Sequence, residues 1–561
     1  MPSKDSAGYC ILPRLFRLEE RAVGVFRKIP FPALLCLIVF TVFSTALKNG
    51  FVNWDDAQYV LSNPALRGSW LDALGFSPGY YHPLTTLTYK LEFVLFGLNP
   101  FPYHFTNLIL HLIACVSAFY LLTALGTRRQ AAFIGALLFG IHPVHAEPVA
   151  WISGRKELLW GIFSSWTLVS YFRFIDTKLK RYFVYSLAFF TLGVFSKPFA
   201  VVLPFVILLA DYYRGRVFNF RLVLEKTPYL AIALPLLTLS TSPSGFLLRS
   251  DAETFSFFGS AASISQNAIF YAQKLVLPVN LSALYPSPEL SWNTVMRFLL
   301  LLFAVLAVCL LTKALSRSSL CARIPAAGPS VAAPGEPGVA KKTFFGLGFF
   351  LITIFPALLV SPPADRYAYL PALGLFFLYS EFIFWLYGAA RGTVHAGPAS
   401  ISGRLIIIAA TGHFFILGLA SAQRVSVWKN SLTLWDDVLG KYPLEYVAYY
   451  GRGNARSAAG EYGNALQDFT RCLELSPRYW KALNNRARLF SETKEFDRAI
   501  ADYGAAISIN PGEARLFLNR GNAYFLKGDS ARAVRDYDRA LAIAPDFTAA
   551  LENKRSAAVR P

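Results

Sequence analysis

Charged residues are scarce in this sequence. Only 16% of its 561 residues are Asp, Glu, Lys or Arg, whereas 55% are hydrophobic. Soluble domains contain about 25% charged residues, so a chain that is soluble along most of its length is excluded. The long apolar runs nearly all precede Gln423. The sequence therefore predicts a membrane-embedded first part followed by a soluble part.

Paired cysteines and nucleotide-binding motifs are also missing. The six cysteines are isolated from one another and form no CxxC pair, which argues against a disulfide framework and a zinc site. Walker A, GxGxxG and GxSxG motifs do not occur in a fitting context, so chemistry on a soluble nucleotide has no support.

Acidic residues are outnumbered, with 34 Asp and Glu against 54 Lys and Arg, a net charge of +20. In a soluble protein this excess would indicate nucleic-acid binding. In a membrane protein, Lys and Arg collect in the cytoplasmic loops, and the apolar runs favour that explanation. We therefore predict contact with membrane lipid and no nucleic-acid partner.

Eleven apolar segments are candidate spans, since crossing a membrane takes about 20 residues of helix. With residues 1–28 in the cytoplasm, this number places the basic loops inside and the C-terminal part outside. The segments 182–196 and 198–213 would alternatively form one kinked element, which would reverse the side of the C-terminal part. The apolar segment 267–285, interrupted by a lysine and a proline, is predicted to be interfacial or re-entrant. The candidate spans are 29–47, 105–126, 131–150, 158–176, 182–196, 198–213, 227–247, 294–315, 343–360, 367–388 and 404–422.

A repeat with a period of 34 residues follows Trp428. Pro477, Pro511 and Pro545 recur at this spacing, and the same offset relates small and aromatic positions. This pattern is typical of the tetratricopeptide repeat. We predict three repeats, at 446–479, 480–513 and 514–547, and a capping tail at 548–561.

The repeats are predicted to bind extended peptide in a concave groove. The alternative is that they only stabilise or oligomerise the protein. Asparagines on the first helix of each repeat are expected to line the groove and hold a peptide backbone. These are Asn454, Asn484, Asn485, Asn519 and Asn522.

Polar clusters beside the spans are candidate functional sites. Asp55 and Asp56 directly follow the first span, and adjacent carboxylates can deprotonate a hydroxyl or hold a divalent cation, although many such pairs are solvated turns. His142, His145 and Glu147 would meet a metal if their backbone were helical, but two prolines in the same stretch favour polar packing instead.

Four cations are predicted on the outer side, namely Arg155, Lys156, Lys197 and Arg366. Converging there, they would suit a lipid-linked phosphate. The alternative is that they extend towards lipid headgroups. His82 adds another polar group before the second span.

The chain resembles the transmembrane and tetratricopeptide-repeat O-mannosyltransferases of the GT-C glycosyltransferase class, especially their bacterial members. The resemblance covers about residues 29–550 and includes the repeats. It rests on ordered blocks at 51–56 (FVNWDD), 81–87 (YHPLTTL), 96–104 (FGLNPFPYH), 142–157 (HPVHAEPVAWISGRKE), 196–211 (SKPFAVVLPFVILLAD) and 364–374 (ADRYAYLPALG). His82 is a departure, because many relatives are expected to have arginine there.

The resemblance implies an all-α protein with a GT-C-like bundle of about 11 spans and an α-solenoid of repeats. The expected parts are a cytoplasmic segment (1–28), the transmembrane domain (29–422), a linker (423–445), the repeats (446–547) and the tail (548–561). We expect a multi-pass protein of the bacterial inner membrane with periplasmic repeats, or alternatively of the endoplasmic reticulum with luminal repeats.

The resemblance further implies transfer of a sugar, mannose by the family's name, from a polyprenyl phosphate to Ser or Thr of a polypeptide bound by the repeats. Asp55 or Asp56 would be the base, and Arg155, Lys197 and Arg366 would bind the donor phosphate. A single displacement would invert the anomeric carbon, and a divalent metal is an open possibility. The rival hypotheses are a non-enzymatic scaffold and a ligase of lipid-linked polysaccharide.

Overall fold

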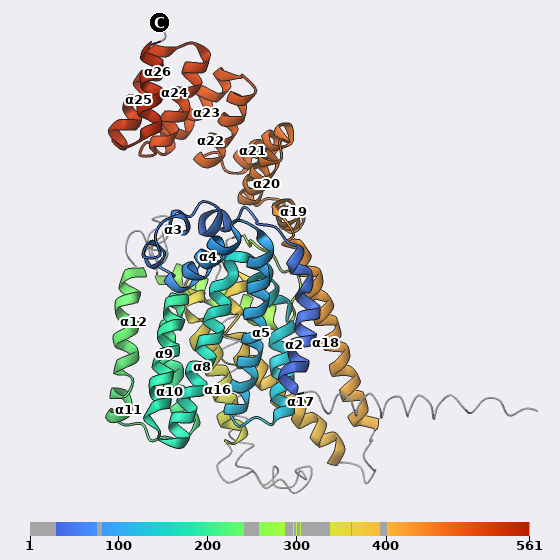
Figure 1. Ribbon diagram of the computed structural model, residues 1–561. Helices are drawn as coiled ribbons and strands as arrows, with labels where there is room; N and C mark the ends of the chain where they lie inside the picture. Colours follow the sequence, from blue (N-terminus) through green and yellow to red (C-terminus); the bar gives the residue numbers. More distant parts are fainter. Residues whose placement is uncertain are drawn as a thin grey trace, which may run out of the picture.

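The structure is a computed structural model. It describes residues 30–75, 81–240, 257–286, 337–360, 362–392 and 401–559, together with residues 296, 299 and 303. Within these residues the chain forms helices and no strand. Figure 1 shows a bundle of long helices and, beyond one end of it, a curved stack of shorter helices that leads to the C-terminus. We call this end of the bundle the repeat end. The predicted all-α fold is confirmed.

All but one of the predicted spans coincide with helices, and the remaining one, 294–315, lies largely outside the described residues. The bundle helices are α2 (Phe31–Phe43), α5 (Pro100–Ala124), α6 (Arg129–Ile141), α8 (Arg155–Thr177), α9 (Lys180–Ser196), α10 (Leu203–Tyr213), α12 (Thr227–Ser240), α16 (Val339–Leu358), α17 (Ala372–Gly392) and α18 (Ile401–Val427).

Five helical segments of the described chain are long and apolar enough to cross a membrane alone. A sixth is obtained if α6 and the segment Pro143–Ala150, which ends in the short helix α7 (Ala146–Ala150), count as one span; the two are bent by 51° at the break between them. The apolar helices at Pro198–Tyr213, Thr227–Leu236 and Ala372–Gly388 are shorter. The protein is thus a multi-pass membrane protein, and the number of eleven spans stays a prediction.

Glycines allow close helix contacts in the bundle. A β-carbon at Gly161 of α8 would lie 2.7 Å from the ring of Tyr369, and one at Gly374 of α17 would lie 2.4 Å from the carbonyl oxygen of Gly346 in α16. Helices in membranes associate through such small residues because backbones can then approach closely. The first contact packs α8 against the segment before α17, and the second packs α17 against α16. Helix α8 also packs against α5 and α9.

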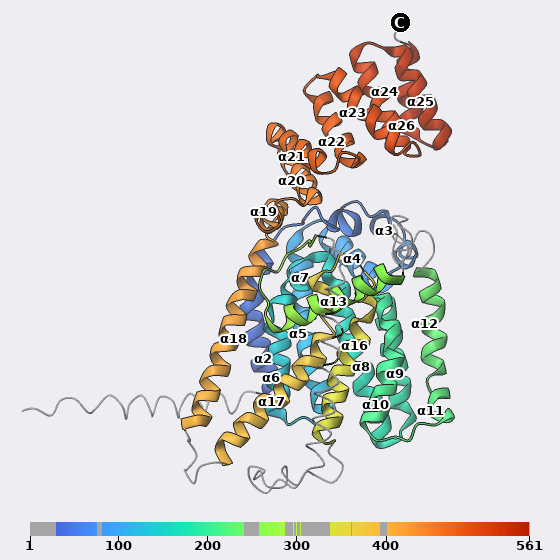
Figure 2. The same cartoon turned by 180° about the vertical axis from the view of Figure 1, so that it is seen from behind.

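Short elements cover the repeat end. They include α3 (Pro64–Arg67) and α4 (Pro83–Phe96), which Figure 1 shows above the long helices. The Nζ atom of Lys90 in α4 donates to the carbonyl oxygens of Ala65, Leu66 and Gly68, at 3.1, 3.2 and 2.7 Å, and so folds α3 onto α4. Helix α13 (Phe257–Val276) runs across the bundle rather than along it (Figure 2).

The C-terminal helices pair as the 34-residue period predicts. An arginine of each first helix bonds an aspartate of the second: Arg452 to Asp468, Arg486 to Asp502 and Arg520 to Asp536, at 2.8, 2.7 and 2.8 Å. The tail forms a further helix whose Ala550 and Ala557 pack against Tyr537. After α19 (Ser431–Lys441), the helices are α20 (Tyr446–Ala458), α21 (Tyr462–Leu475), α22 (Trp480–Glu492), α23 (Phe496–Ile509), α24 (Ala514–Lys527), α25 (Ser530–Ile543) and α26 (Thr548–Val559).

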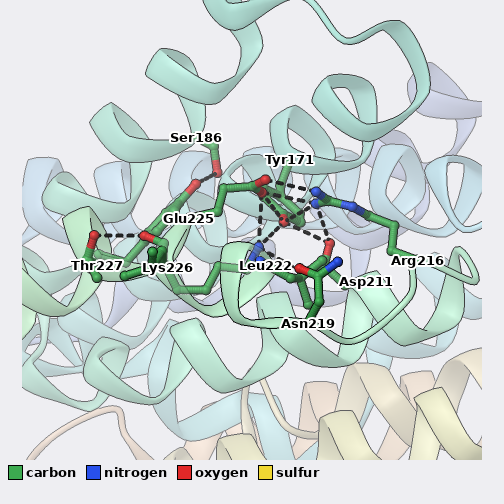
Figure 3. A network of polar contacts seen from close by, with 11 residues as sticks. Tyr171, Ser186, Asp211, Arg216, Asn219, Leu222, Glu225, Lys226 and Thr227 are labelled. Atoms are coloured by element: carbon green, nitrogen blue, oxygen red, sulfur yellow. Dashed lines mark hydrogen bonds and ion pairs between the residues drawn. The ribbon is translucent and has the colours of Figure 1, made fainter.

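A network of charged groups (Figure 3) joins α8, α10 and the residues after α11 (Phe220–Leu224). Figure 1 shows α11 at the end of the bundle opposite the repeats. The Tyr171 hydroxyl lies 2.8 Å from carboxylate oxygens of both Asp211 and Glu225. Lys226, which is buried, pairs with Asp211 at 2.8 Å, and Arg216 pairs with both carboxylates. Two acidic side chains, Asp211 and Glu225, are neutralised by two basic ones, Arg216 and Lys226. We interpret the network as a structural one that holds this end of the bundle together.

From this network we predict that removing one partner of a buried ion pair lowers the stability of the protein much more than removing one partner of an exposed pair. Removing one partner of a buried pair costs about 3 kcal/mol, whereas exposed pairs contribute at most about 1 kcal/mol. We expect Asp211→Asn, beside buried Lys226, to lower the thermal unfolding midpoint in detergent clearly. The control is Asp176→Asn, whose half-exposed side chain pairs with Arg214. Equal midpoints for the two variants would contradict a stabilising role for the buried network.

Candidate functional site

A tight turn at Trp151–Gly154 organises the repeat end. Asn107 of α5 donates through Nδ2 to the carbonyl oxygens of Trp151 and Ile152, at 2.9 and 3.2 Å. Glycine is required at residue 154 because a β-carbon there would lie 2.6 Å from the carbonyl oxygen of Pro148. The turn leads directly into α8, so it sets the positions of Ser153 and of the first residues of that helix.

Arg155, predicted to bind a donor phosphate, is instead surrounded by protein groups. Its Nη atoms lie 2.6 and 3.0 Å from the two carboxylate oxygens of Glu92. Its remaining donors bond Asn107 (2.8 Å), Thr88 (3.2 Å) and the carbonyl oxygen of Tyr103 (3.0 Å). Because all five guanidinium donors are occupied and the side chain is fully buried, Arg155 fastens α8 to α4 and α5 and has no donor to offer a ligand.

Asp56 is also fully engaged. Its Oδ1 accepts from the Ser153 backbone N–H (3.1 Å) and hydroxyl (2.5 Å), and its Oδ2 accepts from the Val52 N–H (3.0 Å). Burial raises the pKa of Asp56 to about 6, against these three hydrogen bonds, which lower it. The carboxylate thus ties the segment after α2 to the turn before α8.

Asp55 differs from its neighbour. Within the described residues its carboxylate makes no hydrogen bond to a protein group, and the side chain is half-buried. It interacts electrostatically with Lys156 and Arg366. The structure therefore separates the two predicted carboxylates: Asp56 is hydrogen-bonded to the protein framework, and Asp55 is within electrostatic range of Lys156 and Arg366.

Three predicted cations, Lys156, Lys197 and Arg366, come together here, and we call them the cation cluster. The Trp151 ring centroid lies 5.8 Å from Lys156 Nζ and 5.3 Å from Arg366 Cζ. The Tyr367 ring centroid lies 4.8 Å from Arg366 Cζ and 4.9 Å from Lys197 Nζ. The shared rings hold these positive charges near one another, and aromatic faces attract cations.

Carboxylates from α7 and α8 hold two members of the cation cluster. Lys197 Nζ lies 2.7 and 2.6 Å from the two carboxylate oxygens of Glu157. Arg366 donates from Nη1 to Glu147 at 2.7 Å and from its backbone N–H at 3.1 Å. Arg366 is the more open of the two, and among the described residues its Nη2 makes a single long contact of 3.5 Å, with the Tyr367 hydroxyl.

His82, at the start of α4, also faces this cluster. Its side chain is buried, and its ring centroid lies 6.4 Å from that of Tyr59. Burial lowers its pKa well below the ordinary value, and the nearby charges of Lys156 and Lys197 lower it further. His82 is therefore neutral at pH 7 and adds no charge for an anion.

The predicted metal ligands His142, His145 and Glu147 do not form a ligand set. His145 Nδ1 lies 2.6 Å from the carbonyl oxygen of Phe139, and Glu147 is paired with Arg366. In the part of the chain that the structure describes, no three His, Cys, Asp or Glu side chains are grouped so as to hold a metal. His145 and Glu147 are thus engaged with protein groups.

The predicted groove asparagines bond one another along the first helices of the repeats. Asn485 donates to Asn454 at 2.7 Å, and Asn519 donates to Asn484 at 3.0 Å. Asn522 accepts from the Tyr537 hydroxyl at 2.9 Å. The residues are thus aligned in one row from repeat to repeat, as their spacing predicts.

Sequence reasoning missed the residues that hold Asp56 and the cations, above all Ser153, Trp151 and Tyr367. Each lies within a block that contained predicted site residues, at 142–157 or 364–374. Their position next to predicted site residues in the sequence, together with their aromatic or hydroxyl side chains, could have identified them as supporting residues of the site.

Comparison with known proteins gives matches in both parts of the chain. Residues 80–243 match the family model for dolichyl-phosphate-mannose-protein mannosyltransferase, and residues 449–514 and 514–547 match models for the tetratricopeptide repeat.

Curated relatives carry the name protein O-mannosyl-transferase. One from Caenorhabditis elegans is 26% identical over 80% of this chain and 63% of its own length. Human TMTC1 is 32% identical over 26% of this chain and 18% of its own length. This chain thus spans less than two thirds of either relative. Among solved structures, an oligosaccharyltransferase of Archaeoglobus fulgidus matches over 78% of this chain and 58% of its own, with 14% identity and a TM-score of 0.41.

Asp56 predicts a pH dependence of stability. Its pKa is about 6 in the folded chain and 3.8 ordinarily, so the folded state binds the proton more tightly than the unfolded state. Its contribution is therefore fully present below pH 4 and is lost as the pH rises through 6. We expect the unfolding midpoint of Asp56→Asn to fall less than that of the wild type between pH 4 and pH 7. Parallel pH profiles would show that Asp56 is not the titrating group.

Proposed function

We propose that the chain, which is similar to proteins named protein O-mannosyl-transferase and contains tetratricopeptide repeats, is a membrane glycosyltransferase. The proposed reaction moves a sugar, mannose in keeping with the relatives' names, from a polyprenyl phosphate to a Ser or Thr hydroxyl of a protein. The observation that carries the proposal is that the Asp55 carboxylate makes no hydrogen bond to a protein group in the described residues and is within electrostatic range of Lys156 and Arg366. A candidate base and candidate anion-binding groups then occur at one site, as this chemistry requires.

Asp55 is the proposed base. A base needs an oxygen that is open to the acceptor hydroxyl, and the Asp55 carboxylate is not consumed by protein hydrogen bonds in the described residues. The oxygens of Asp56 accept from Val52 and Ser153 instead. Asp56 is accordingly a support that fixes the backbone next to the base.

The cation cluster is the proposed donor-phosphate site. Arg366 is the first choice, since its weakly engaged Nη2 donors match phosphate oxygens. Lys156 interacts electrostatically with both Asp55 and Arg366, which supports a role for it next to the leaving phosphate. Lys197 is held by Glu157 and adds its charge at longer range. Arg155 has no part in this proposal.

The proposed reaction is a single displacement. The acceptor hydroxyl oxygen attacks the anomeric carbon while its proton passes to Asp55. The bond between the anomeric carbon and the phosphate oxygen breaks, and its electron pair leaves with the polyprenyl phosphate. Positive charge placed beforehand stabilises this departing anion. Attack from the opposite face inverts the anomeric carbon.

Two matched substitutions test the assignment of the base. Asp55→Asn should lower sugar transfer by at least about 100-fold, the contribution of a general base, with little effect on the unfolding midpoint. Asp56→Asn should cost less activity and more stability, because it removes one of the oxygens that hold Val52 and Ser153. The measurement is radiolabel moved from a polyprenyl-phosphate sugar to protein. The reverse order of activities would make Asp56 the base.

The repeats are proposed to hold the acceptor polypeptide, so that a high local concentration replaces a tight sequence motif. Support comes from the continuous row of asparagines on the first helices. Arrays of this kind bind peptides on an extended concave surface. We place the repeats on the outer side of a bacterial inner membrane, with the lumen of the endoplasmic reticulum as the alternative.

The groove makes its own prediction. Asn485→Ala combined with Asn519→Ala should weaken binding of an acceptor polypeptide by about tenfold or more, because two linked amides are lost from the row. Asn464→Ala on α21, where the side chain is exposed and bonds Glu461, is the control. Binding measured by fluorescence anisotropy should change only in the double variant. An unchanged affinity would leave the repeats as a scaffold.

A further inference from the structure

The segment that carries Asp55 is bonded to α19, which lies in the predicted linker, and to α20, the first helix of the repeats. We call α19 and the repeat helices after it the repeat domain. The Asn53 backbone N–H donates to the Ser431 hydroxyl of α19 at 2.9 Å. Asn53 Nδ2 donates to the carbonyl oxygen of Gly451 in α20 at 2.8 Å, and Asn53 Oδ1 accepts from Trp435 Nε1 at 2.6 Å. One side chain and its own backbone thus join segments that are distant in sequence, two residues before Asp55.

Neighbouring residues extend this attachment. The rings of Trp54 and Trp435 meet edge to face with centroids 5.2 Å apart. The Gly50 N–H donates to the carbonyl oxygen of Lys429 at 2.9 Å. On its other side the segment is tied to the bundle through Asp56 and Ser153. Asp55 therefore lies between one anchor in the membrane domain and another in the repeat domain.

The first repeat differs from the other two at the residue that contacts Asn53, which is Gly451. The equivalent positions of the next two repeats, 34 and 68 residues later, are Asn485 and Asn519 of the groove row. A β-carbon at residue 451 would lie 2.2 Å from a ring carbon of Trp435 and 2.6 Å from its Nε1. The first repeat thus lacks the groove side chain, and the indole that bonds Asn53 occupies the space.

We propose that Asn53 and Trp435 are positioning residues, through which the repeat domain holds Asp55 at the cation cluster. This inference rests on the proposed function for its catalytic part. A hydrogen-bonded clamp restrains the backbone of residues 50–56, so loosening α19 from Asn53 lets Asp55 leave its place beside Lys156 and Arg366. The position of Asp55 is then coupled to the position of the repeat domain, so the rate of sugar transfer depends on how the repeats are oriented on the bundle.

The contact also has a purely structural explanation, namely that it only attaches the repeats to the bundle. The two explanations differ in what they predict for the segment itself. Loss of a contact that only attaches the repeats lowers the stability of the whole protein. Loss of a positioning contact makes residues 50–56 open locally more often and slows the chemical step, while the affinity for the sugar donor is unchanged.

The test uses the full chain in detergent or nanodiscs, with Trp435→Phe to remove the indole N–H and Gly451→Ala to displace the ring. Gly440→Ala on α19, where a β-carbon meets nothing within 4 Å, is the control. Hydrogen–deuterium exchange is followed in peptides covering residues 50–61, in α8 and in α22–α25. Transfer of labelled sugar gives kcat and the KM for the donor.

We expect at least tenfold faster exchange in residues 50–61 for both variants, unchanged exchange in α8 and α22–α25, and a kcat lowered about tenfold with the donor KM within twofold. The control should match the wild type. Unchanged exchange in residues 50–61, or faster exchange with an unchanged kcat, would overturn the proposal. If the wild type transfers no sugar, the proposed function fails, and the exchange measurement still decides whether the clamp holds the segment.

Discussion

A charge that is buried in a membrane bundle is costly unless an opposite charge lies beside it. This constraint orders the repeat end of the protein, where each of three ion pairs joins elements that are distant in sequence. Together they fix the start of α8, the break between α9 and α10, and the turn before α17. The pairs are Arg155 with Glu92, Lys197 with Glu157, and Arg366 with Glu147. The remaining polar groups of the site are placed on this framework.

Asp55 stands apart because it faces the cations without being bonded into the framework. Its place is set by the residues around it, with Asp56 bonded to Ser153 on one side and Asn53 bonded to Trp435 on the other. The backbone is thus held while the carboxylate stays available, which is what a base requires. In the proposed mechanism the repeats would both bind the acceptor and help to position Asp55.

Much of the fold was predictable because its signals are local or periodic. The 34-residue period predicted the helix pairs of the repeats, and apolar runs predicted the bundle helices. The site was only partly predictable. Arg155 and Lys156 are adjacent, but successive helix residues point about 100° apart, and tertiary packing decides which one meets Glu92 and which one meets Asp55. The Asn53–Trp435 bond depends on the three-dimensional arrangement alone, although glycine at 451, where later repeats have asparagine, was a visible departure.

The central claim is that the chain transfers a sugar from a lipid phosphate to a protein hydroxyl. The most direct measurement incubates the purified full-length protein with a radiolabelled polyprenyl-phosphate sugar and an acceptor polypeptide, and then treats the labelled product with mild alkali. The proposed function predicts label on the polypeptide that alkali releases by β-elimination, as for a sugar linked to Ser or Thr. Label that stays in lipid or polysaccharide, with none on protein, would contradict it and favour the ligase or scaffold hypotheses.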